Sequence, residues 1–484
     1  MPKCKKISQE KSNGRVYTPD FIVNNILDLS GYISTNILCK HVIDNSCGDG
    51  AFLMEIVKRY CKACLDNGYT EIEIKKDLSK YIHGVEIDEF ECKKCKNNLD
   101  KVTQSYGITD VCWDIKNSNT LLVHEYDNKM DFVLGNPPYI RIHNVNDELQ
   151  IKKFSFSQFG MTDLFITFYE IGLNMLNDTG VLGYITPSSY FNSQAATYMR
   201  KYFLSENLIQ SIVDLKHLQV FSATTYSAIT ILNKNKYSKN IEFYEYDLTK
   251  QQPYFVDELS PKDFYISTNF IFSTKHNLSL LKKIYNNLGH CDIEVKNGYA
   301  TLCDSVYIND FQFESQYIIP AIKASKGLVT KMIYPYDEQA IPIPESVIRL
   351  DTKLYDYLIA HKPELLNRSK KDSATEKWYT FGRSQALKDT FKDKLTLNTL
   401  LRNKDDIKMH EAPAGTGVYG GLYIISNTYG FNEIQAVLKT DEFVSFITLL
   451  GKYKSGGYYS FSTKDVKLYL DYKFAYNGGI LANE

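Results

Sequence analysis

Short apolar runs alternate with amphipathic stretches along the first half of the chain. The apolar runs have the length of buried strands and lie at 41–44, 81–88, 111–115, 132–134, 181–185, 209–213 and 226–232. Beside them, apolar residues recur at helical spacing, most clearly at 22–29, 52–57 and 163–176. This alternation predicts an α/β fold with a doubly wound, Rossmann-like sheet.

The rhythm of strands and helices is lost from about Tyr237 onward. Short aromatic, strand-like pieces follow, for example at 292–308 and 317–333, and glycine-rich turns interrupt the later sequence. A chain of 484 residues is too long for one hydrophobic core. We therefore expect two domains, an α/β domain at 1–245 and an α+β module at 246–484 whose long loops suit recognition.

Composition and charge limit the partners that this chain can have. No apolar run approaches the ~20 residues of a membrane span, and the basic N-terminus lacks the apolar core of a secretion signal. We therefore expect a cytoplasmic protein with no membrane partner and with reduced thiols. The net charge of −1 gives no support for a nucleic-acid partner, so a DNA surface would need a local concentration of Lys and Arg.

Two CxxC pairs, Cys61-x2-Cys64 and Cys92-x2-Cys95, have the spacing of zinc half-sites. The gap between the two pairs is longer than in common zinc ribbons, and both pairs lie in helix-like sequence. We therefore expect free thiols on two helices and no metal site.

Polar side chains follow four successive predicted strands. The four residues that stand where these strands should end are Asp44, Glu86, Asp114 and Asn136. Ligands of open α/β sheets bind at the carboxyl ends of the strands. We therefore expect the four side chains to outline one crevice.

A glycine-rich turn, Asp-Asn-Ser-Cys-Gly-Asp-Gly at 44–50, joins the first strand to a helix. It lacks GxGxxG and also the Gly-Lys-Ser/Thr of a phosphate loop. Its glycines are expected to let the backbone approach a ligand closely, and a tight turn without a ligand is the alternative.

A helix start is predicted at Thr18-Pro19-Asp20, with Thr18 as the N-cap, Pro19 at the first helical position and Asp20 in the first turn. A capped helix is the plain interpretation. The sharper one places Tyr17 and Thr18 over a ligand.

The sequence Asn136-Pro137-Pro138-Tyr139 ends the fourth strand in a stiff turn, because proline cannot donate to a ladder. The Asn136 amide and the Pro137 carbonyl offer two acceptors, and Tyr139 offers a stacking face. This combination suits a planar ring with an exocyclic NH2 group. Phe221 lies in a polar loop, where it either packs under the chain or stacks opposite Tyr139.

Five motifs occur in a fixed order: Gly-Arg-Val-Tyr-Thr-Pro, Asp-Asn-Ser-Cys-Gly-Asp-Gly-Ala-Phe, Gly-Val-Glu-Ile-Asp, Asn-Pro-Pro-Tyr and Val-Phe-Ser-Ala-Thr-Thr-Tyr-Ser-Ala. In these motifs the first half of the chain resembles the gamma class of N6-adenine DNA methyltransferases, the TaqI- and Eco57I-like enzymes. The resemblance implies a catalytic domain followed by a DNA target-recognition domain. It extends loosely into the second half, at 297–308 and 333–336.

The resemblance implies S-adenosylmethionine as the cofactor. The residues that it places at the cofactor are Tyr17, Thr18, Asp44, Ser46, Gly48, Gly50, Glu86, Ile87, Asp114, Ile115, Asn136 and Leu164. The turn and Thr18 would face the methionine half, Glu86 the ribose, and Ile87, Asp114 and Ile115 the adenine, while Leu164 would close the pocket. The chain departs from the more frequent Asp-Pro-Ala-Cys-Gly at Asn45, a change expected to loosen the turn slightly.

The implied activity is site-specific methylation of adenine N6 in double-stranded DNA, with the base flipped out of the helix. The catalytic residues would be Asn136, Pro137, Pro138 and Tyr139, and the target base would stack on Tyr139 and Phe221. Alternatives are a glutamine or RNA methyltransferase and an inactive DNA-binding specificity module. The resemblance further implies a monomer. Because the chain starts almost at the methyltransferase motifs, we expect any cognate restriction endonuclease to be a separate protein.

Overall fold

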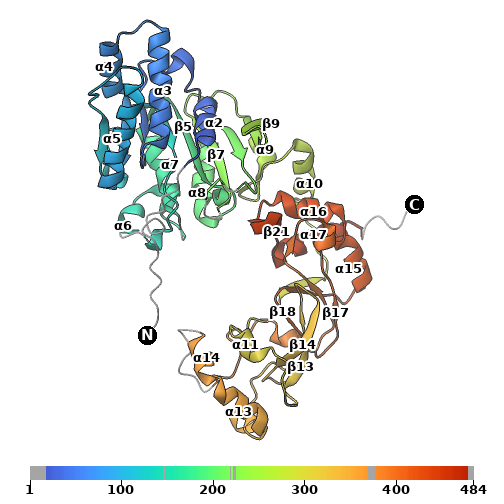
Figure 1. Cartoon of the computed structure of the whole chain (residues 1–484). Coiled ribbons are helices and arrows are strands. Elements are labelled where there is room, and N and C mark those ends of the chain that lie inside the picture. Colours follow the sequence, from blue (N-terminus) through green and yellow to red (C-terminus); the bar gives the residue numbers. More distant parts are fainter. Residues whose placement is uncertain are drawn as a thin grey trace. The chain divides into compact units, whose positions relative to one another are not determined.

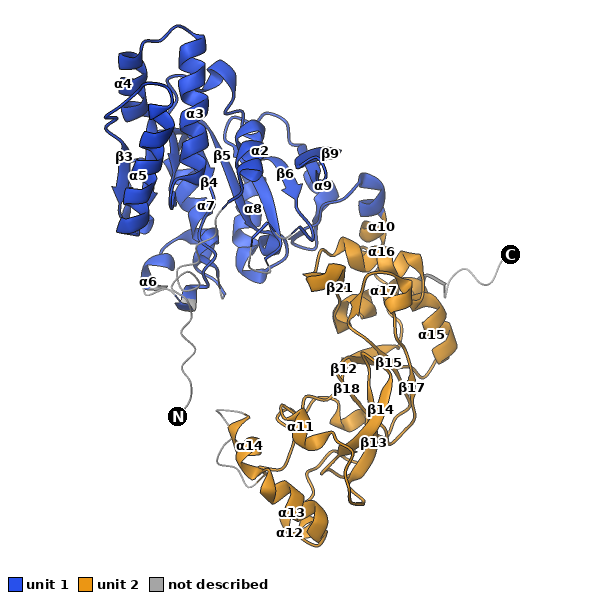
Figure 2. Cartoon of the chain, in the orientation of Figure 1, with its two compact units in different colours: residues 1–279 blue, residues 280–484 orange. Residues whose placement is uncertain are grey.

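The computed structural model describes residues 18–477, except 145–147, 161, 219, 222–224 and 369–376. The chain divides into two compact units, unit 1 at Met1–Ser279 and unit 2 at Leu280–Glu484 (Figure 2). Each unit has its own sheets and its own buried core. The prediction of two domains agrees with this division.

Unit 1 is built on a mixed sheet with the strand order β3-β2-β1-β4-β5-β7-β6-β8-β9 (Figure 1). Its strands are β1 Val42–Asp44, β2 Ile82–Glu86, β3 Asp114–Asn117, β4 Met130–Gly135, β5 Leu176–Pro187, β6 Ile209–Asp214, β7 Ser227–Asn233, β8 Ile241–Asp247 and β9 Gln252–Leu259. The first five strands are parallel, whereas β7 runs antiparallel to both β5 and β6. The predicted α/β fold is confirmed.

Helices cover both faces of this sheet. The helices of four or more residues that begin in unit 1 are α2 Asp20–Leu29, α3 Ala51–Asp66, α4 Glu71–Tyr81, α5 Glu89–Gln104, α6 Glu148–Ile151, α7 Leu164–Met175, α8 Thr197–Ser205, α9 Pro261–Phe264 and α10 Lys275–Tyr285. Side chains alternate between the faces of a strand. On β5, Leu182 and Tyr184 lie against Gly172 of α7, and Gly183 lies against Ile26 of α2. The helices α2 and α7 therefore pack on opposite faces.

The predicted domain boundary after residue 245 falls inside β8, whereas the compact units divide after Ser279. Strand β8 pairs in parallel with β6, and β9 pairs with β8, so both strands extend the sheet of unit 1. Ile241 and Phe243 of β8 are buried in that unit. The loss of the strand–helix rhythm at Tyr237 therefore marks the edge of the sheet and not the end of the unit.

Unit 2 is an α+β unit with three small sheets, as the sequence predicts. Its strands are β12 Glu294–Asn297, β13 Ile318–Lys323, β14 Leu328–Ile333, β15 Lys394–Leu397, β16 Leu400–Leu401, β17 Glu411–Ala412, β18 Gly417–Tyr419, β19 Leu422–Ile425, β20 Tyr453–Lys454 and β21 Tyr458–Ser460. Its helices are α11 Asp304–Tyr307, α12 Glu345–Ile348, α13 Thr352–Ala360, α14 Lys362–Asn367, α15 Phe431–Leu438, α16 Asp441–Leu449 and α17 Thr463–Asn477.

The stretch at 367–383, in which basic and aromatic residues alternate, contributes to the core of unit 2. Trp378 is buried, and its indole N–H donates to Glu345. The Arg368 guanidinium donates to the Tyr307 hydroxyl and to the carbonyls of Trp378 and Thr380. Trp378 and Arg368 of this stretch therefore have structural roles in unit 2. Residues 369–376 lie outside the described part.

None of the helices in the described ranges is long and apolar enough to cross a lipid bilayer.

We predict that Gly183→Ala lowers the free energy of unfolding of unit 1 by about 1–3 kcal/mol, the usual cost of overpacking. A Cβ at this position would lie 2.9 Å from Leu134 Cδ2 and 3.0 Å from Ile26 Cγ2, so α2 would have to move away from β5. Urea denaturation in a Trp378→Phe background measures this effect, because Trp113 of unit 1 is then the one remaining tryptophan.

The matched control is Gly430→Ala. Gly430 has a φ of −69°, and the nearest atom to its Cβ would be Glu433 Oε2 at 3.7 Å. This variant should leave the Trp113 transition unchanged. An equally unchanged transition in Gly183→Ala would contradict the tight packing of α2 on β5.

Candidate active site

Three parallel strands bring polar residues to one edge of the sheet. Strand β1 ends at Asp44, β2 ends at Glu86, and β4 ends at Gly135, directly before Asn136. The strand β1 lies between the other two and pairs in parallel with both, so all three carboxyl ends point the same way. A Cβ on Gly135 would lie 2.6 Å from Asp44 Oδ1, which shows how closely β1 and β4 approach there.

The predicted strand end at Asp114 is wrong, because β3 begins at Asp114 and ends at Asn117. Asp114 pairs in register with His83, whose Nδ1 lies 2.7 Å from Asp114 Oδ2, and it also accepts from the Tyr126 hydroxyl. Ile115 is 3% exposed and lies against Gly84 in the core. Both Asp114 and Ile115 therefore have structural contacts away from the carboxyl edge.

The sequence analysis did not single out Asn117, Asn119 and Thr120, which lie at the end of β3 and directly after it. The Asn117 amide donates to the carbonyls of Glu86 and Ile87, and the Thr120 hydroxyl donates to the Asn45 carbonyl. Asn119 Oδ1 accepts from the Leu121 amide. The feature of the sequence that could have identified this strand end is the polar run Asn-Ser-Asn at 117–119, which directly follows an apolar and charged segment.

The glycine-rich turn wraps around the end of β2. Gly48 and Gly50 have φ values of +51° and +96°, a backbone conformation that favours glycine. The Gly48 amide donates to Glu86 Oε2 at 2.9 Å, and the Asp88 amide donates to Glu86 Oε1 at 2.8 Å. Asp88 in turn is the N-cap of α5. The Glu86 carboxylate therefore lies at the strand end, next to the turn.

Asn45 holds the turn in a way that a proline cannot. It is fully buried, and its Oδ1 accepts from the Tyr184 hydroxyl of β5 at 2.9 Å. Its carbonyl accepts from Thr120 at 2.7 Å. These bonds tie the turn to two neighbouring elements, so the expected loosening is offset by side-chain hydrogen bonds.

Asp44 is a buried carboxyl group with an unusual affinity for protons. It is 2% exposed, and its Oδ1 accepts from the Ser46 amide at 3.0 Å. The pKa of Asp44 is raised to about 7 as the net result of three effects: burial raises it most, the hydrogen bond from the Ser46 amide lowers it, and the negative charge of Glu86 raises it. The site therefore favours a positively charged ligand near Asp44 at neutral pH.

Thr18 is not the N-cap of α2. Pro19 is the N-cap, and its carbonyl accepts from the amides of Ile22 and Val23. The Thr18 side chain is 3% exposed, and its hydroxyl oxygen accepts from Asn136 Nδ2 at 3.0 Å. Tyr17 lies outside the described residues.

Asn136 and the two prolines form the turn that the sequence predicts at the end of β4. The Ser46 hydroxyl donates to the Asn136 carbonyl at 3.3 Å. Pro137 is buried, and Pro138 is half-buried. The turn therefore lies directly beside the glycine-rich turn.

The rings of Tyr139 and Phe221 are in contact, and Phe221 is packed under the chain. Their centroids are 5.8 Å apart, and the planes meet at 75°, an edge-to-face contact. The Tyr139 hydroxyl donates to the Ile185 carbonyl, and Phe221 is 5% exposed. In this structure the two rings are in contact with each other, so there is no gap between them in which a base could stack.

Leu164 begins α7 and is buried. Its amide donates to the Ile140 carbonyl at 2.8 Å, which fixes the start of α7 to the segment just after Tyr139.

The four cysteines of the CxxC pairs lie on helices, as predicted. Cys61 and Cys64 are buried on α3, and Cys92 and Cys95 are buried on α5. Within the described ranges, no group of three or more His, Cys, Asp and Glu side chains is arranged to hold a metal ion.

Known proteins share this architecture. Residues 28–221 match the family described as Eco57I restriction-modification methylase. The type II methyltransferase M.BstVI of Geobacillus stearothermophilus is 27% identical over 76% of this chain and 74% of its own length. The type II restriction enzyme and methyltransferase RM.Eco57I of Escherichia coli is 25% identical over 93% of this chain and 56% of its own length.

Among solved structures, the type IIL restriction-modification enzyme MmeI in complex with DNA has a similar fold, with a TM-score of 0.61 and 14% identity. The similarity covers 93% of this chain and 64% of the MmeI chain. The chain thus spans less than two thirds of both RM.Eco57I and MmeI.

The matched segment contains the turn after β1, the end of β2 and the Asn-Pro-Pro-Tyr turn after β4, so the family match and the geometry concern the same edge of the sheet. The resemblance inferred from the motifs is confirmed. Over residues 28–221 the chain therefore matches the Eco57I restriction-modification methylases, and it is similar to the type II methyltransferase M.BstVI along most of its length.

Proposed function

We propose that this chain methylates the N6 atom of one adenine in a specific double-stranded DNA sequence, after the base has left the helix. One observation carries the proposal: Asn136 stands at the end of β4, beside the buried carboxyl group of Asp44 on β1. This arrangement supports a hydrogen-bond acceptor for an amino group close to a site that favours a cation.

The residues at the strand ends fit S-adenosylmethionine. Nothing lies within 4 Å of the position that a Cβ on Gly48 would take, so a ligand can approach this backbone closely. Asp44, Ser46, Gly48 and Gly50 suit the methionine half, whose sulfonium and ammonium groups are positive. Glu86 suits the ribose hydroxyls.

The adenine of the cofactor fits the surface next to Glu86. Ile87 is 68% exposed there and offers an apolar face. Leu164 closes the pocket on the side of α7 in this proposal. Asp114 and Ile115 are removed from the set of cofactor ligands, because their contacts lie in the core and at the start of β3.

In the proposed mechanism, the bound cofactor would supply a methyl group to adenine N6 by direct displacement: the methyl–sulfur bond would break as the methyl–nitrogen bond forms, and one N6 proton would then pass to solvent. The cofactor supplies the methyl group on a sulfonium, which is a good leaving system. Asn136 Oδ1 and the Pro137 carbonyl accept hydrogen bonds from the N6 hydrogens, and so stabilise the positive charge that develops on the nitrogen. A strong base is not required, which agrees with an amide at position 136.

The presence of unit 2 is the argument for double-stranded DNA as the substrate. A methyltransferase for glutamine side chains has no need of a recognition unit that spans 280–484. The relative RM.Eco57I is named a restriction enzyme and methyltransferase, and MmeI was solved in complex with DNA. We propose that unit 2 recognises the DNA sequence and that a restriction endonuclease of the same specificity accompanies this activity.

The proposed activity is tested by transfer of tritiated methyl groups from S-adenosylmethionine to DNA, RNA and protein in parallel. Label in N6-methyladenine of duplex DNA is the expected result. Label confined to protein or RNA would favour the rival methyltransferases, and cofactor-free DNA binding without any transfer would favour the specificity module.

We predict that Asn136→Ala lowers the rate of methyl transfer by at least ~10²-fold, the usual loss when a group that stabilises transition-state charge is removed. Binding of S-adenosylmethionine, measured by calorimetry, should remain. Asn67→Ala, at an exposed asparagine after α3, is the control with wild-type activity. Turnover by Asn136→Ala at the wild-type rate would refute the assignment of Asn136.

We predict that Phe221→Ala weakens the trapping of the flipped base, since aromatic stacking contributes ~1–3 kcal/mol per base. A 2-aminopurine at the target position of duplex DNA should gain less fluorescence with this variant than with the wild type. Phe159→Ala, at an exposed ring on the same unit, is the control. Equal fluorescence for Phe221→Ala and the wild type would count against the stacking role.

We predict that the affinity for S-adenosylmethionine falls about tenfold for each pH unit below 7. The pKa of Asp44 is raised to about 7, chiefly by burial, so acid protonates it in the empty protein. A cationic ligand favours the ionised carboxylate, so it has to displace that proton. Calorimetric titrations between pH 5.5 and 7.5 measure the slope.

The variant Asp44→Asn should bind the cofactor weakly and with no such slope. Asp66→Asn, at an exposed carboxylate on α3, should keep the wild-type slope. The same slope in Asp44→Asn as in the wild type would show that another group titrates.

A further inference from the structure

We propose that Thr18 is a positioning residue that fixes which end of the Asn136 amide faces the substrate. This inference rests on the proposed function of Asn136. Its basis is the bond from Asn136 Nδ2 to the Thr18 hydroxyl oxygen at 3.0 Å, made by a threonine side chain that is 3% exposed.

The two ends of an amide have opposite hydrogen-bonding character. The oxygen accepts, whereas the NH2 group only donates. The N6 amino group of adenine donates both of its hydrogens, so only Asn136 Oδ1 can receive one of them. A half-turn of the amide would bring two donors together and would remove the acceptor from the site.

The backbone does not decide between these two orientations. The Ser46 hydroxyl holds the Asn136 carbonyl, and the contact between Gly135 and Asp44 fixes the end of β4. The last side-chain torsion of asparagine, however, is broad and roughly two-fold. A hydroxyl can accept or donate. In this structure the Thr18 hydroxyl accepts from the NH2 end, and this bond holds the amide in the orientation that leaves Oδ1 for the substrate.

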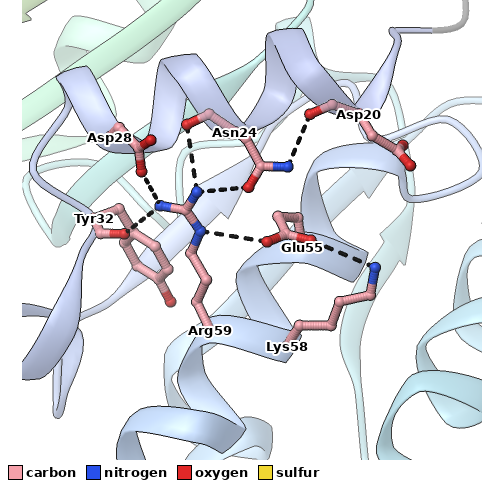
Figure 3. A network of polar contacts seen from close by, with 7 residues as sticks. All are labelled: Asp20, Asn24, Asp28, Tyr32, Glu55, Lys58 and Arg59. Carbon is pink, nitrogen blue, oxygen red and sulfur yellow. Dashed lines mark hydrogen bonds and ion pairs between the residues drawn. The ribbon is translucent and has the colours of Figure 1, made fainter.

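The position of Thr18 depends on α2, which begins two residues later. The side chain of Arg59 on α3 forms hydrogen bonds and an ion pair with residues of α2, as Figure 3 shows. Its Nη1 donates to Asp28 Oδ1 at 2.7 Å and to the Tyr32 carbonyl at 3.1 Å, and its Nη2 donates to Asn24 Oδ1 at 2.7 Å. The helix that follows the glycine-rich turn therefore also anchors the helix that follows Thr18.

The side-chain amide of Asn24 in this network is also held by a hydrogen bond from its NH2 group. Asn24 Nδ2 donates to the Asp20 carbonyl at 2.9 Å, which leaves Oδ1 to accept from Arg59 (Figure 3). In both asparagines, an acceptor at the NH2 end selects the direction of the oxygen.

The test compares Thr18→Val, which keeps the shape of the side chain but has no acceptor, with Thr18→Ser. For Thr18→Val we expect kcat for DNA methylation to fall by about 10- to 100-fold, while the Kd for S-adenosylmethionine changes less than threefold. Thr18→Ser should recover most of the lost kcat. A Thr18→Val variant with unchanged kcat and a strongly raised cofactor Kd would overturn the proposal, because it would show that Thr18 only contacts the cofactor.

A second measurement does not depend on catalysis. In protein labelled with 15N-asparagine, the NH2 signals of Asn136 are assigned by their absence in Asn136→Asp. We expect slow hydrogen exchange of these signals in the wild type and in Thr18→Ser, and faster exchange in Thr18→Val. Equal exchange in all three proteins would overturn the positioning role. A wild type that fails to methylate adenine would instead refute the proposed function, since the exchange measurement would still report the bond.

The contribution of α2 is tested with Arg59→Gln and the matched control Lys58→Gln. Lys58 is the neighbour of Arg59 on α3, and its ammonium contacts only Glu55 of the same helix at 3.4 Å among the contacts in Figure 3. Arg59→Gln should speed the exchange of the Asn136 NH2 group and lower kcat, whereas Lys58→Gln should change neither. No effect of Arg59→Gln on either quantity would overturn the link from Arg59 to Asn136.

Discussion

The close approach of β1 and β4 at their carboxyl ends is the constraint on which the site depends. No side chain fits at Gly135, because a Cβ there would collide with Asp44 Oδ1. This contact places a buried carboxyl group and the Asn136 turn side by side. It also makes the carboxyl group difficult to ionise, because little water reaches it and Glu86 lies nearby. A sulfonium cofactor and an amine substrate need such a pair of neighbours, one that favours a cation and one that accepts from an amino group.

The fold could be predicted because most of its signals are local. Six of the seven apolar runs predicted in unit 1 coincide with strands, and three of these strands end at Asp44, at Glu86 and directly before Asn136. Two elements were misplaced where the local pattern was ambiguous. At Asp114, the apolar residues before it suggested a strand that ends there, whereas pairing with β2 begins there. At Thr18, the predicted side-chain cap is wrong, because Pro19 is the N-cap without a side-chain bond and the Thr18 hydroxyl accepts from a residue 118 positions away.

The remaining differences come from contacts that no local pattern contains. Trp378 and Arg368 lie in a stretch that alternates basic and aromatic residues, yet Trp378 is buried and Arg368 donates to the carbonyl of Trp378. The sequence pattern at Tyr237 does not reveal that the sheet continues with β8, because β8 pairs with β6, which precedes it by about thirty residues. Asn45 shows the same limit, because the hydrogen bond that holds the turn in place of the missing proline comes from Tyr184 on β5. Sequence patterns report which residues are buried, and they do not report which neighbours bury them.

The edge-to-face contact of Tyr139 with Phe221 changes the energetic account of base flipping. Extrusion of a base costs a few kcal/mol, and stacking returns ~1–3 kcal/mol for each base–ring contact. Because the two rings contact each other in this structure, a base that stacks on both must first separate them, at a cost of ~0.5–1.5 kcal/mol for an aromatic pair. The Tyr139 hydroxyl is held by the Ile185 carbonyl at the end of β5, whereas Phe221 lies on a loop. In the proposed mechanism it is therefore Phe221 that has to move, while Tyr139 would remain as the fixed face against which the base is placed.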